Sequence, residues 1–429
     1  MKFSLLEKIF SIKNSDDKKY KICTIAGIKI KYLDRSKIKK LLAYYENCQK
    51  QFKKYDKYVP IADEKFNINI NTKLIAFYLP QFHTFPENEL WHGRGFTEWT
   101  NVTKAMPQYT GHYQPHLPID VGFYDLSTDK VMYRQIELAK MYGLSGFCFH
   151  YYWFSGKRLM ETPIFNYLNN KDLDFPFCLC WANENWTRKW DGANNEILME
   201  QNLKSGDWKQ FADDIMPFFD DERYIKINGC PVLIIYRPGL FNQDIFLDFV
   251  KNLKTEISKK HKGLYLIMAR TWDAPDKIPS DFGMDAAVEF PPHVMNNLQP
   301  KKIFEHVNKD FRGHIFDAEK YIENNNYIYS VDYPLYKSVF PNWDNTARRE
   351  NTSDILEIRP TQYKKWLTGC IEWTKQHHKP EEQFVFINAW NEWAEGAHLE
   401  PDRKYGYAYL QATREALEDT ADSRCVELK

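Results

Sequence analysis

The chain has 429 residues, and its 58 basic and 58 acidic side chains leave no net charge at pH 7 when histidine is neutral. That balance excludes a global field that would attract nucleic acid or an anionic membrane, so a neutral ligand fits better. The hydrophobic share of 43% supports a sizeable core, and the length suits one large barrel with an appendage or about two to three ordinary domains.

Residues 1–60 differ from the rest of the chain because they are rich in lysine. Alternation after Gly27 predicts a β-hairpin, and a helical pattern follows over Lys37–Lys57. This basic appendage permits peripheral contact with a membrane or with polysaccharide assembly machinery, although a solvated capping segment is the simpler alternative. No run approaches ~18 apolar residues, so we expect a cytoplasmic protein, with any inner-membrane association made through the appendage.

From Leu74 onward, apolar runs alternate with helical patterns. The runs predict buried strands at Leu74–Tyr78, Gly146–Trp153, Phe175–Trp181, Pro231–Tyr236, Leu264–Ala269, Ala286–Phe290, Tyr327–Val331 and Phe384–Trp390. The helical patterns lie at Thr128–Tyr142, Trp208–Phe219, Gln243–His261, Lys302–Phe311, Thr361–His377 and Tyr407–Leu417. The alternation favours an α/β fold, a (β/α)8 TIM barrel over residues 73–420, with an open doubly wound sheet as the rival. The long connections His83–Asp125 and Pro334–Pro360 are typical of active-site loops.

Signals for metals, cofactors and disulfides are missing. The chain has no CxxC pair, no zinc or calcium ligand spacing and no phosphate-binding glycine loop, so we expect neither a metal nor a cofactor. Asp172–Asp174 has the Asp-x-Asp form of metal-dependent sugar-nucleotide transferases, but it precedes a strand and is interpreted as a turn. The cysteines in or beside apolar runs are expected to be reduced core thiols: Cys148, Cys178, Cys180 and Cys230.

Polar and aromatic residues gather where the predicted strands end. In a barrel the carboxyl ends of the strands meet on one rim, so these dispersed segments would line one cleft. Flat rings in such a cleft cover the apolar faces of sugars. The candidate substrate-binding residues are Tyr78, His83, Trp99, His150, Tyr151, Trp153, Trp181, Asn183, Glu184, Trp186, Tyr236, Trp272, Trp343, Asp344, Asn391 and Trp393.

Several of these residues have structural alternatives. Glu184 can bind hydroxyl groups or pair with Arg188 at four residues' spacing. Hydrogen-bonded structural roles or interior packing would equally explain His83, His150, Trp153 and Trp181.

The last predicted strand runs into an acidic turn. Glu392 and Glu395 would point to opposite faces of a continued strand, whereas a tight-turn path could direct both into one pocket. Gly396 is expected to end the regular backbone conformation of this segment. Two carboxylates beside aromatic walls are what glycosidic-bond chemistry uses, whereas a solvated turn is the alternative.

Four segments, in order, resemble the WbsX-type family of bacterial surface-polysaccharide biosynthesis proteins, which is similar to glycoside hydrolase family 99, the endo-α-mannosidase-like family. They are Ile75–His83, Gly95–Val102, Trp181–Trp186 and Asn388–Gly396, and the resemblance covers residues 73–417. It implies a (β/α)8 barrel and a retaining mechanism on mannose-like sugars in O-antigen or capsule assembly. A short segment near the N-terminus also looks like one found ahead of capsule and lipopolysaccharide glycosyltransferases.

The resemblance also implies roles for the two glutamates. Glu392 would draw the proton from the substrate's 2-hydroxyl to give a 1,2-anhydro sugar, and Glu395 would be the general acid and base. Tyr236 would lie near the reacting sugar. Ala394 stands where family 99 usually has histidine, so substrate choice does not carry over. The alternative activity is that of a nucleotide-sugar-dependent glycosyltransferase, as the WbsX type is often labelled.

Overall fold

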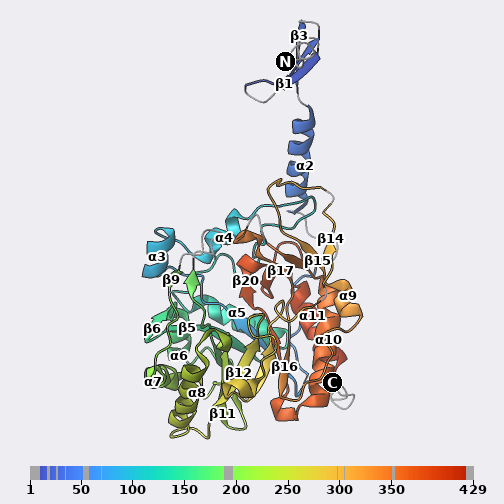
Figure 1. The fold of residues 1–429 in the computed structure, drawn as a ribbon. Helices are drawn as coiled ribbons and strands as arrows, with labels where there is room; N and C mark the ends of the chain where they lie inside the picture. The colour runs from blue at the N-terminus through green and yellow to red at the C-terminus, as the bar shows by residue number, and fades with distance from the viewer. Residues whose placement is uncertain are drawn as a thin grey trace. The chain divides into compact units, whose positions relative to one another are not determined.

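The computed structural model describes residues 10–16, 20–25, 28–33, 35–51, 58–68, 70–187, 197–296, 298–303, 305–349 and 353–421 (Figure 1). The chain divides into two compact units. The smaller unit comprises residues 1–53, 107–113 and 303–309, and the larger one comprises residues 54–106, 114–302 and 310–429. The two inserted segments of the smaller unit were not anticipated from the sequence.

The smaller unit contains an antiparallel sheet of three strands, β1 (Phe10–Asn14), β2 (Tyr20–Ile25) and β3 (Ile28–Leu33), followed by helix α2 (Arg35–Gln51). The predicted hairpin is confirmed, because β2 and β3 pair from Ile25 with Ile28 to Tyr20 with Leu33. Within the described ranges, no helix is both long and apolar enough to cross a membrane.

The larger unit is built on a closed barrel of parallel strands. Each strand pairs with the next in chain order, and the last pairs with the first. In that order they are β4 (Lys73–Tyr78), β5 (Gly146–Phe154), β7 (Phe177–Trp181), β11 (Cys230–Ile235), β12 (Tyr265–Arg270), β13 (Ala286–Glu289), β16 (Leu335–Val339) and β19 (Phe384–Ile387). The predicted (β/α)8 TIM barrel is therefore confirmed, and the open sheet is excluded.

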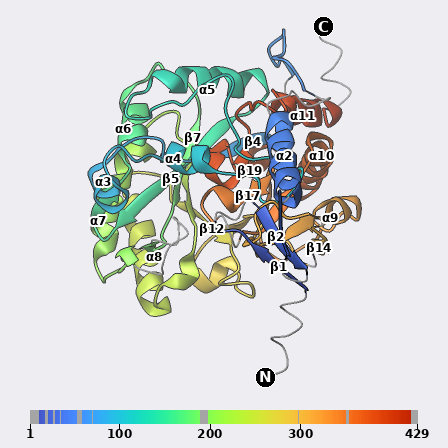
Figure 2. The ribbon, with the colours of Figure 1, turned by 90° about the horizontal axis from the view of Figure 1, so that it is seen from above.

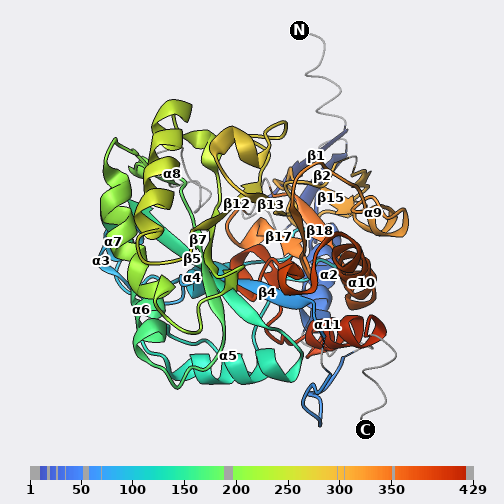
Figure 3. The same cartoon turned by 90° about the horizontal axis from the view of Figure 1, so that it is seen from below.

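Helices surround this barrel, as Figure 2 and Figure 3 show from opposite ends. They are α5 (Lys130–Met141), α6 (Thr162–Asn169), α7 (Asp207–Phe219), α8 (Gln243–Ile257), α9 (Glu319–Glu323), α10 (Pro360–His377) and α11 (Ala408–Asp419). The short helices α3 (Pro86–His92) and α4 (Glu98–Lys104) belong to the connection that follows β4. Apolar side chains of the helices and strands, such as Phe211 and Leu233, form one core. Cys148, Cys178 and Cys180 are buried free thiols in it, and Cys230 is a free thiol at its edge.

Short strands form the connections above the barrel. They include β8 (Trp186–Thr187) with β9 (Ile197–Met199), and β20 (Asn391–Glu392) with β21 (Ala397–His398). A further sheet has the order β14 (Pro300–Lys301), β15 (Ile315–Asp317), β18 (Ile355–Glu357) and β17 (Trp343–Asp344). The remaining short strands are β6 (Lys157–Leu159) and β10 (Lys226–Ile227).

The helix predicted over Lys302–Phe311 is wrong. The described residues of this segment form turns and bends, and the backbone N–H groups of Val307 and Asn308 both donate to the Gln108 carbonyl. These bonds to a distant segment take the place of helical ones.

The seventh strand is also corrected, from Tyr327–Val331 to Leu335–Val339. The aromatic and β-branched composition of the first segment suggested a strand, whereas Lys337 interrupts the apolar pattern of the second. Lys337 is nevertheless fully buried, because its ammonium lies 2.8 Å from Glu289 Oε1 and donates to the Tyr327 carbonyl. The ammonium of Lys337 lies over the Trp373 ring of α10, so the ion pair is buried between the barrel and this helix. A buried charge thus interrupted the hydrophobic pattern by which the strand would have been recognised.

Candidate active site

The acidic turn after β19 is a hairpin. Glu392 ends β20, a single 3-10 turn over Trp393–Glu395 follows, and β21 returns. The turn ends at Gly396, whose φ of 63° lies in the left-handed region that glycine adopts readily. Both glutamates line one cavity of about 510 Å³ at the carboxyl end of the barrel, as a tight-turn path predicts.

Arg348 binds both glutamates. Its terminal nitrogens lie 2.9 Å from Glu392 Oε1 and 2.8 Å from Glu395 Oε1, and its Nε lies 2.9 Å from Glu98 Oε1. The arginine side chain is 2% exposed, Glu392 6% and Glu395 15%, so Glu395 is the more open of the two acids. One planar guanidinium therefore contacts three carboxyl groups.

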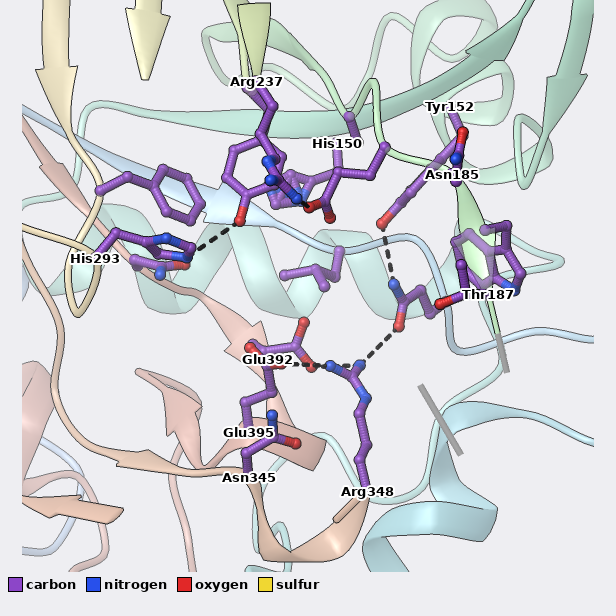
Figure 4. Close-up of a pocket in the computed structure, with 18 of the residues that line it drawn as sticks. His150, Tyr152, Asn185, Thr187, Arg237, His293, Asn345, Arg348, Glu392 and Glu395 are labelled. Carbon is purple, nitrogen blue, oxygen red and sulfur yellow. Dashed lines mark hydrogen bonds and ion pairs between the residues drawn. The ribbon is translucent and has the colours of Figure 1, made fainter. Parts of the chain in front are cut away.

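A hydrogen-bonded chain continues from this arginine. Arg348 donates to Gln81 Oε1 at 3.0 Å, and Gln81 Nε2 donates to the Tyr152 hydroxyl at 3.0 Å. Figure 4 shows this chain running from Arg348 to Tyr152 along one edge of the pocket. Gln81 and Tyr152, which follow β4 and lie in β5, thus hold the arginine in place and line the pocket themselves.

Burial raises the pKa of Glu392 well above its usual value, while Arg348 lowers it and Glu395 raises it further. Burial also raises the pKa of Glu395, again against the effect of Arg348. Two neighbouring carboxyls that disfavour double ionisation tend to hold one proton between them. That state provides one acid and one base.

The opposite side of the cavity carries a second ion-pair group. Arg237 pairs with Glu184 and lies 3.0 Å from Asp273 Oδ1 through its Nε. Its guanidinium lies 4.8 Å from the centre of the Trp272 ring, which is 63% exposed. Figure 4 places Arg237 across the cavity from Glu392. This side therefore offers a charged, hydrogen-bonding wall beside an open aromatic ring.

Neutral polar groups complete the pocket. Burial lowers the pKa of His150 to about 4, and burial together with Arg237 lowers that of His293 to about 4, so both rings are neutral at pH 7. The Tyr236 hydroxyl and His293 Nε2 share a hydrogen bond of 3.3 Å. Such uncharged donors and acceptors suit a hydroxylated ligand.

The cavity brings together eight of the residues predicted from the sequence, namely Glu392, Glu395, His150, Glu184, Trp186, Tyr236, Trp272 and Trp343. Arg188, the alternative partner of Glu184, lies outside the described residues, and Glu184 pairs with Arg237.

The other predicted residues do not line this cavity: Tyr78, His83, Trp99, Tyr151, Trp153, Trp181, Asn183, Asp344, Asn391 and Trp393. Their placement does not support substrate contact, because all are buried in the packing. Trp153 donates to Asp214 on α7, and Trp181 Nε1 donates to the Trp153 carbonyl. The ring of Tyr151 packs against Phe218. These alternating strand residues face the surrounding helices and not the rim.

Several of the buried residues support the rim from below. Asn391 exchanges hydrogen bonds with both backbone groups of Leu79, and Asn183 does so with Arg237. The carboxylate of Asp344 accepts from Gln114. The other contacts are Tyr78 to Gln135, His83 to the Pro80 carbonyl and Trp99 to the Tyr124 carbonyl.

Glu400 braces the acidic hairpin. Its carboxylate accepts from the indole N–H of Trp393 at 2.6 Å and of Trp390 at 3.1 Å, and also from Tyr124 and Gln135. Burial raises the pKa of Glu400 to about 7, although all four hydrogen bonds lower it. This carboxyl lies outside the pocket lining.

Sequence reasoning missed Arg348, Gln81, Tyr152 and His293 as site residues. Gln81 and Glu98 lie within the segments that carried the family resemblance, so their motif context was the available signal. Arg348 lies in an irregular connection between β17 and α10, where no periodicity points to it.

A family model described as Glycosyltransferase WbsX matches residues 74–413. The chain is 42% identical over 351 residues to the uncharacterized protein WxcX of Xanthomonas campestris pv. campestris strain B100, and equally to WxcX of a second strain. Each alignment covers 81% of this chain and 50% of the relative, so the chain spans half the length of these relatives.

Among solved structures, a glycoside hydrolase-like protein is similar with a TM-score of 0.52 and 14% identity, over 84% of this chain and 98% of that one. That likeness shows the barrel fold. A GH99 endo-alpha-mannosidase from Bacteroides thetaiotaomicron has a TM-score of 0.47 and 13% identity, over 82% of this chain and 98% of that one.

Proposed function

The chain belongs to the WbsX glycosyltransferase family of carbohydrate-active enzymes, and from this premise we propose that it cleaves or transfers a mannose- or rhamnose-like α-glycosidic bond with retention of configuration. The substrate would be an oligosaccharide or polysaccharide of O-antigen or capsule assembly. The observation that carries the proposal is the pair Glu392 and Glu395, which share Arg348 and face one cavity.

In the first step, Glu392 removes the proton of the substrate's 2-hydroxyl, and this oxygen attacks the anomeric carbon. The bond from that carbon to the leaving oxygen breaks, and Glu395 gives its proton to the leaving oxygen. The product of this step is a 1,2-anhydro sugar with Glu392 protonated and Glu395 ionised.

In the second step, Glu395 takes the proton of an incoming water or sugar hydroxyl as its oxygen attacks the anomeric carbon. The 1,2-anhydro ring opens, and Glu392 returns its proton to the sugar's O2. Two inversions at one carbon give overall retention. Water as acceptor makes the reaction a hydrolysis, and a sugar hydroxyl makes it a transfer.

The test uses aryl α-mannosides, aryl α-rhamnosides and lipid-linked oligosaccharide as substrates for the full chain. Glu392→Gln and Glu395→Gln keep the side-chain shape and remove the acid–base chemistry, so each should abolish most turnover. An aryl substrate with a good leaving group should rescue the first step of the Glu395→Gln variant, but not that of Glu392→Gln. Undiminished turnover in both variants would overturn the proposal.

A second candidate function is transfer from a nucleotide sugar, which the family's description as a glycosyltransferase favours. Arg237 and Arg349 line the cavity, and their guanidinium groups could donate to a phosphate. Titration with nucleoside diphosphate sugars tests this candidate. Saturable binding that is lost in Arg349→Gln, together with release of nucleoside diphosphate, would support it over the first.

The smaller unit is proposed to contact the cytoplasmic face of the inner membrane. Ile12, Ile25, Ile28 and Ile30 are exposed on the same face of its sheet, and the strand register places Lys21 on that face as well. Apolar side chains beside basic ones suit an anionic lipid surface.

The full chain should float with anionic vesicles, and the double substitution Ile28→Ser and Ile30→Ser should weaken this flotation. Equal flotation of both proteins would contradict lipid contact through this face.

A further inference from the structure

A cluster of two histidines and one aspartate includes His398 of β21, the second strand of the acidic hairpin. His116, His398 and Asp402 are all buried, and one donor atom from each lies within 4.8 Å of the other two. His116 Nδ1 is 2.9 Å from His398 Nε2, which in turn is 3.9 Å from Asp402 Oδ2. None of the three lines the cavity of the proposed active site.

The chemistry of these donors suits a divalent transition metal. Two imidazole nitrogens and one carboxylate oxygen are ligands that Zn²⁺ takes at about 2.0–2.2 Å, which puts neighbouring donors about 3.3 Å apart in a tetrahedral site. The two measured separations, 2.9 and 3.9 Å, lie on either side of that spacing. Small movements of side chains would therefore complete the geometry.

His398 is already oriented as a ligand. Its Nδ1 lies 2.9 Å from the Glu400 carbonyl, which can only accept, so Nδ1 carries the proton and Nε2 presents a lone pair to the cluster. A backbone carbonyl on the far nitrogen is the usual orienting partner of a metal-bound histidine.

Asp402 is held in a similar way. Its Oδ1 accepts from the backbone N–H groups of Lys404 and Tyr405, at 2.8 and 2.7 Å, so that Oδ2 faces His398. One oxygen thus fixes the side chain while the other is directed at the cluster. The residues come from two distant segments, because His116 and His398 are 282 positions apart.

We propose that His116, His398 and Asp402 form a binding site for a divalent transition metal, with Zn²⁺ as the first candidate. The His398 ring stacks on Trp393, with centroids 3.8 Å apart, and β21 pairs Asn391 with His398. A metal here would tie the segment around His116 to the hairpin that carries Glu392 and Glu395. The three protein donors leave one coordination position for a water molecule.

The proposal is tested on the full chain, purified without chelator from medium that contains zinc, by elemental analysis for first-row metals and by thermal unfolding. We expect about one metal ion per chain, a lower Tm after treatment with a chelator, and recovery of that Tm with added Zn²⁺. His398→Asn and Asp402→Asn should lose the metal. His83→Asn removes another buried, carbonyl-bonded histidine outside the cluster and should retain it.

Wild-type protein without bound metal, and without a rise in Tm on addition of Zn²⁺, would overturn the proposal, and the two histidines would then form a hydrogen-bonded pair only. If His398→Asn does not fold, Asp402→Asn decides, because asparagine keeps the turn bonds of Oδ1 and loses the charge. Retention of full metal content by that variant would also contradict the site. These readouts do not depend on the glycosidic activity.

Discussion

Glu395 and Glu400 are two carboxyl groups of the same segment, five residues apart, with opposite surroundings. Glu395 faces the cavity, its side chain is 15% exposed, and its Oε1 lies 2.8 Å from Arg348. Glu400 is 1% exposed and is surrounded by four neutral donors, two of which are Trp390 and Trp393. The first can exchange a proton with a ligand, whereas the second cannot reach one.

The comparison teaches that burial alone does not mark a catalytic acid. Burial raises the pKa of both carboxyls, so a perturbed pKa would select either one. What differs is access to the cavity and the presence of a cation. We therefore expect changes at Glu395 to alter turnover and changes at Glu400 to alter stability.

The largest expected effect follows from exchanging the two carboxyls for amides. Glu395→Gln should reduce kcat/KM on an unactivated glycoside by about 10²–10⁴-fold, because general acid–base catalysis contributes that much. Its Tm should change little. Glu400→Gln should reverse this pattern, with a lower Tm and most of the turnover retained. Steady-state kinetics and thermal unfolding of both variants check this. Equal losses of turnover would contradict the assignment of Glu395 to turnover and Glu400 to stability.

Arg348 provides the next largest effect. Arg348→Gln leaves Glu98, Glu392 and Glu395 buried without their cation, so it should cost about 3–5 kcal/mol of unfolding free energy at neutral pH. Since Arg348 lowers the pKa of Glu392 and Glu395, its loss raises both values further. The destabilisation should therefore shrink at low pH, where the carboxyls are protonated.

Urea denaturation at pH 5 and pH 8 measures this difference. Arg348→Lys, which keeps the charge but not the planar fork, should recover only part of the stability. The low-pH limb of the activity profile should move to higher pH in Arg348→Gln. An unchanged profile would show that the arginine does not set the protonation of the pair.

The site residues differ in whether they could be predicted from the sequence. Glu392 and Glu395 were found because a short motif and a tight-turn path brought them together, which is local information. Arg348 binds Glu98 across 250 residues of sequence, and no local pattern predicts such a contact. Glu400 was passed over because a buried acid is recognisable only once its donors are known.

The same distinction holds for the fold. Apolar runs predicted seven of the eight barrel strands, because burial on both faces leaves a continuous hydrophobic signal. The strand that was missed, Leu335–Val339, contains Lys337, whose partner Glu289 lies on β13. The rim was predicted as a whole, but residues such as Trp153 and Trp181 were assigned to it although their side chains face outward against the helices.

A smaller effect is expected in the pH dependence of stability. Burial raises the pKa of Glu400 to about 7, above the usual value for an unfolded chain. The folded state thus binds the proton more tightly, and the resulting stabilisation is complete below about pH 4.5 and lost as pH rises through about 7.

Glu400→Gln removes this titration. The unfolding free energy of the wild type, relative to that of Glu400→Gln, should therefore fall by up to about 3 kcal/mol between pH 5 and pH 8. Glu137→Gln, at a half-exposed helix position, is the matched control for exchanging a carboxyl for an amide at the surface. A difference that does not vary with pH would mean that Glu400 is ionised throughout.

The smallest expected effect concerns two tryptophans, one at the cavity and one in the core. Trp272 is 63% exposed at the cavity, whereas Trp390 is fully buried and donates to Glu400. If Trp272 stacks on a sugar ring, Trp272→Ala should raise KM about fivefold, as expected for the loss of about 1 kcal/mol of aromatic contact. Its kcat and Tm should change little, because the ring is not part of the core.

Trp390→Phe should instead lower Tm and leave KM unchanged. Steady-state kinetics and thermal unfolding of the two variants distinguish a ring that contacts substrate from a ring that supports the core. An unchanged KM in Trp272→Ala would show that Trp272 does not contact the substrate.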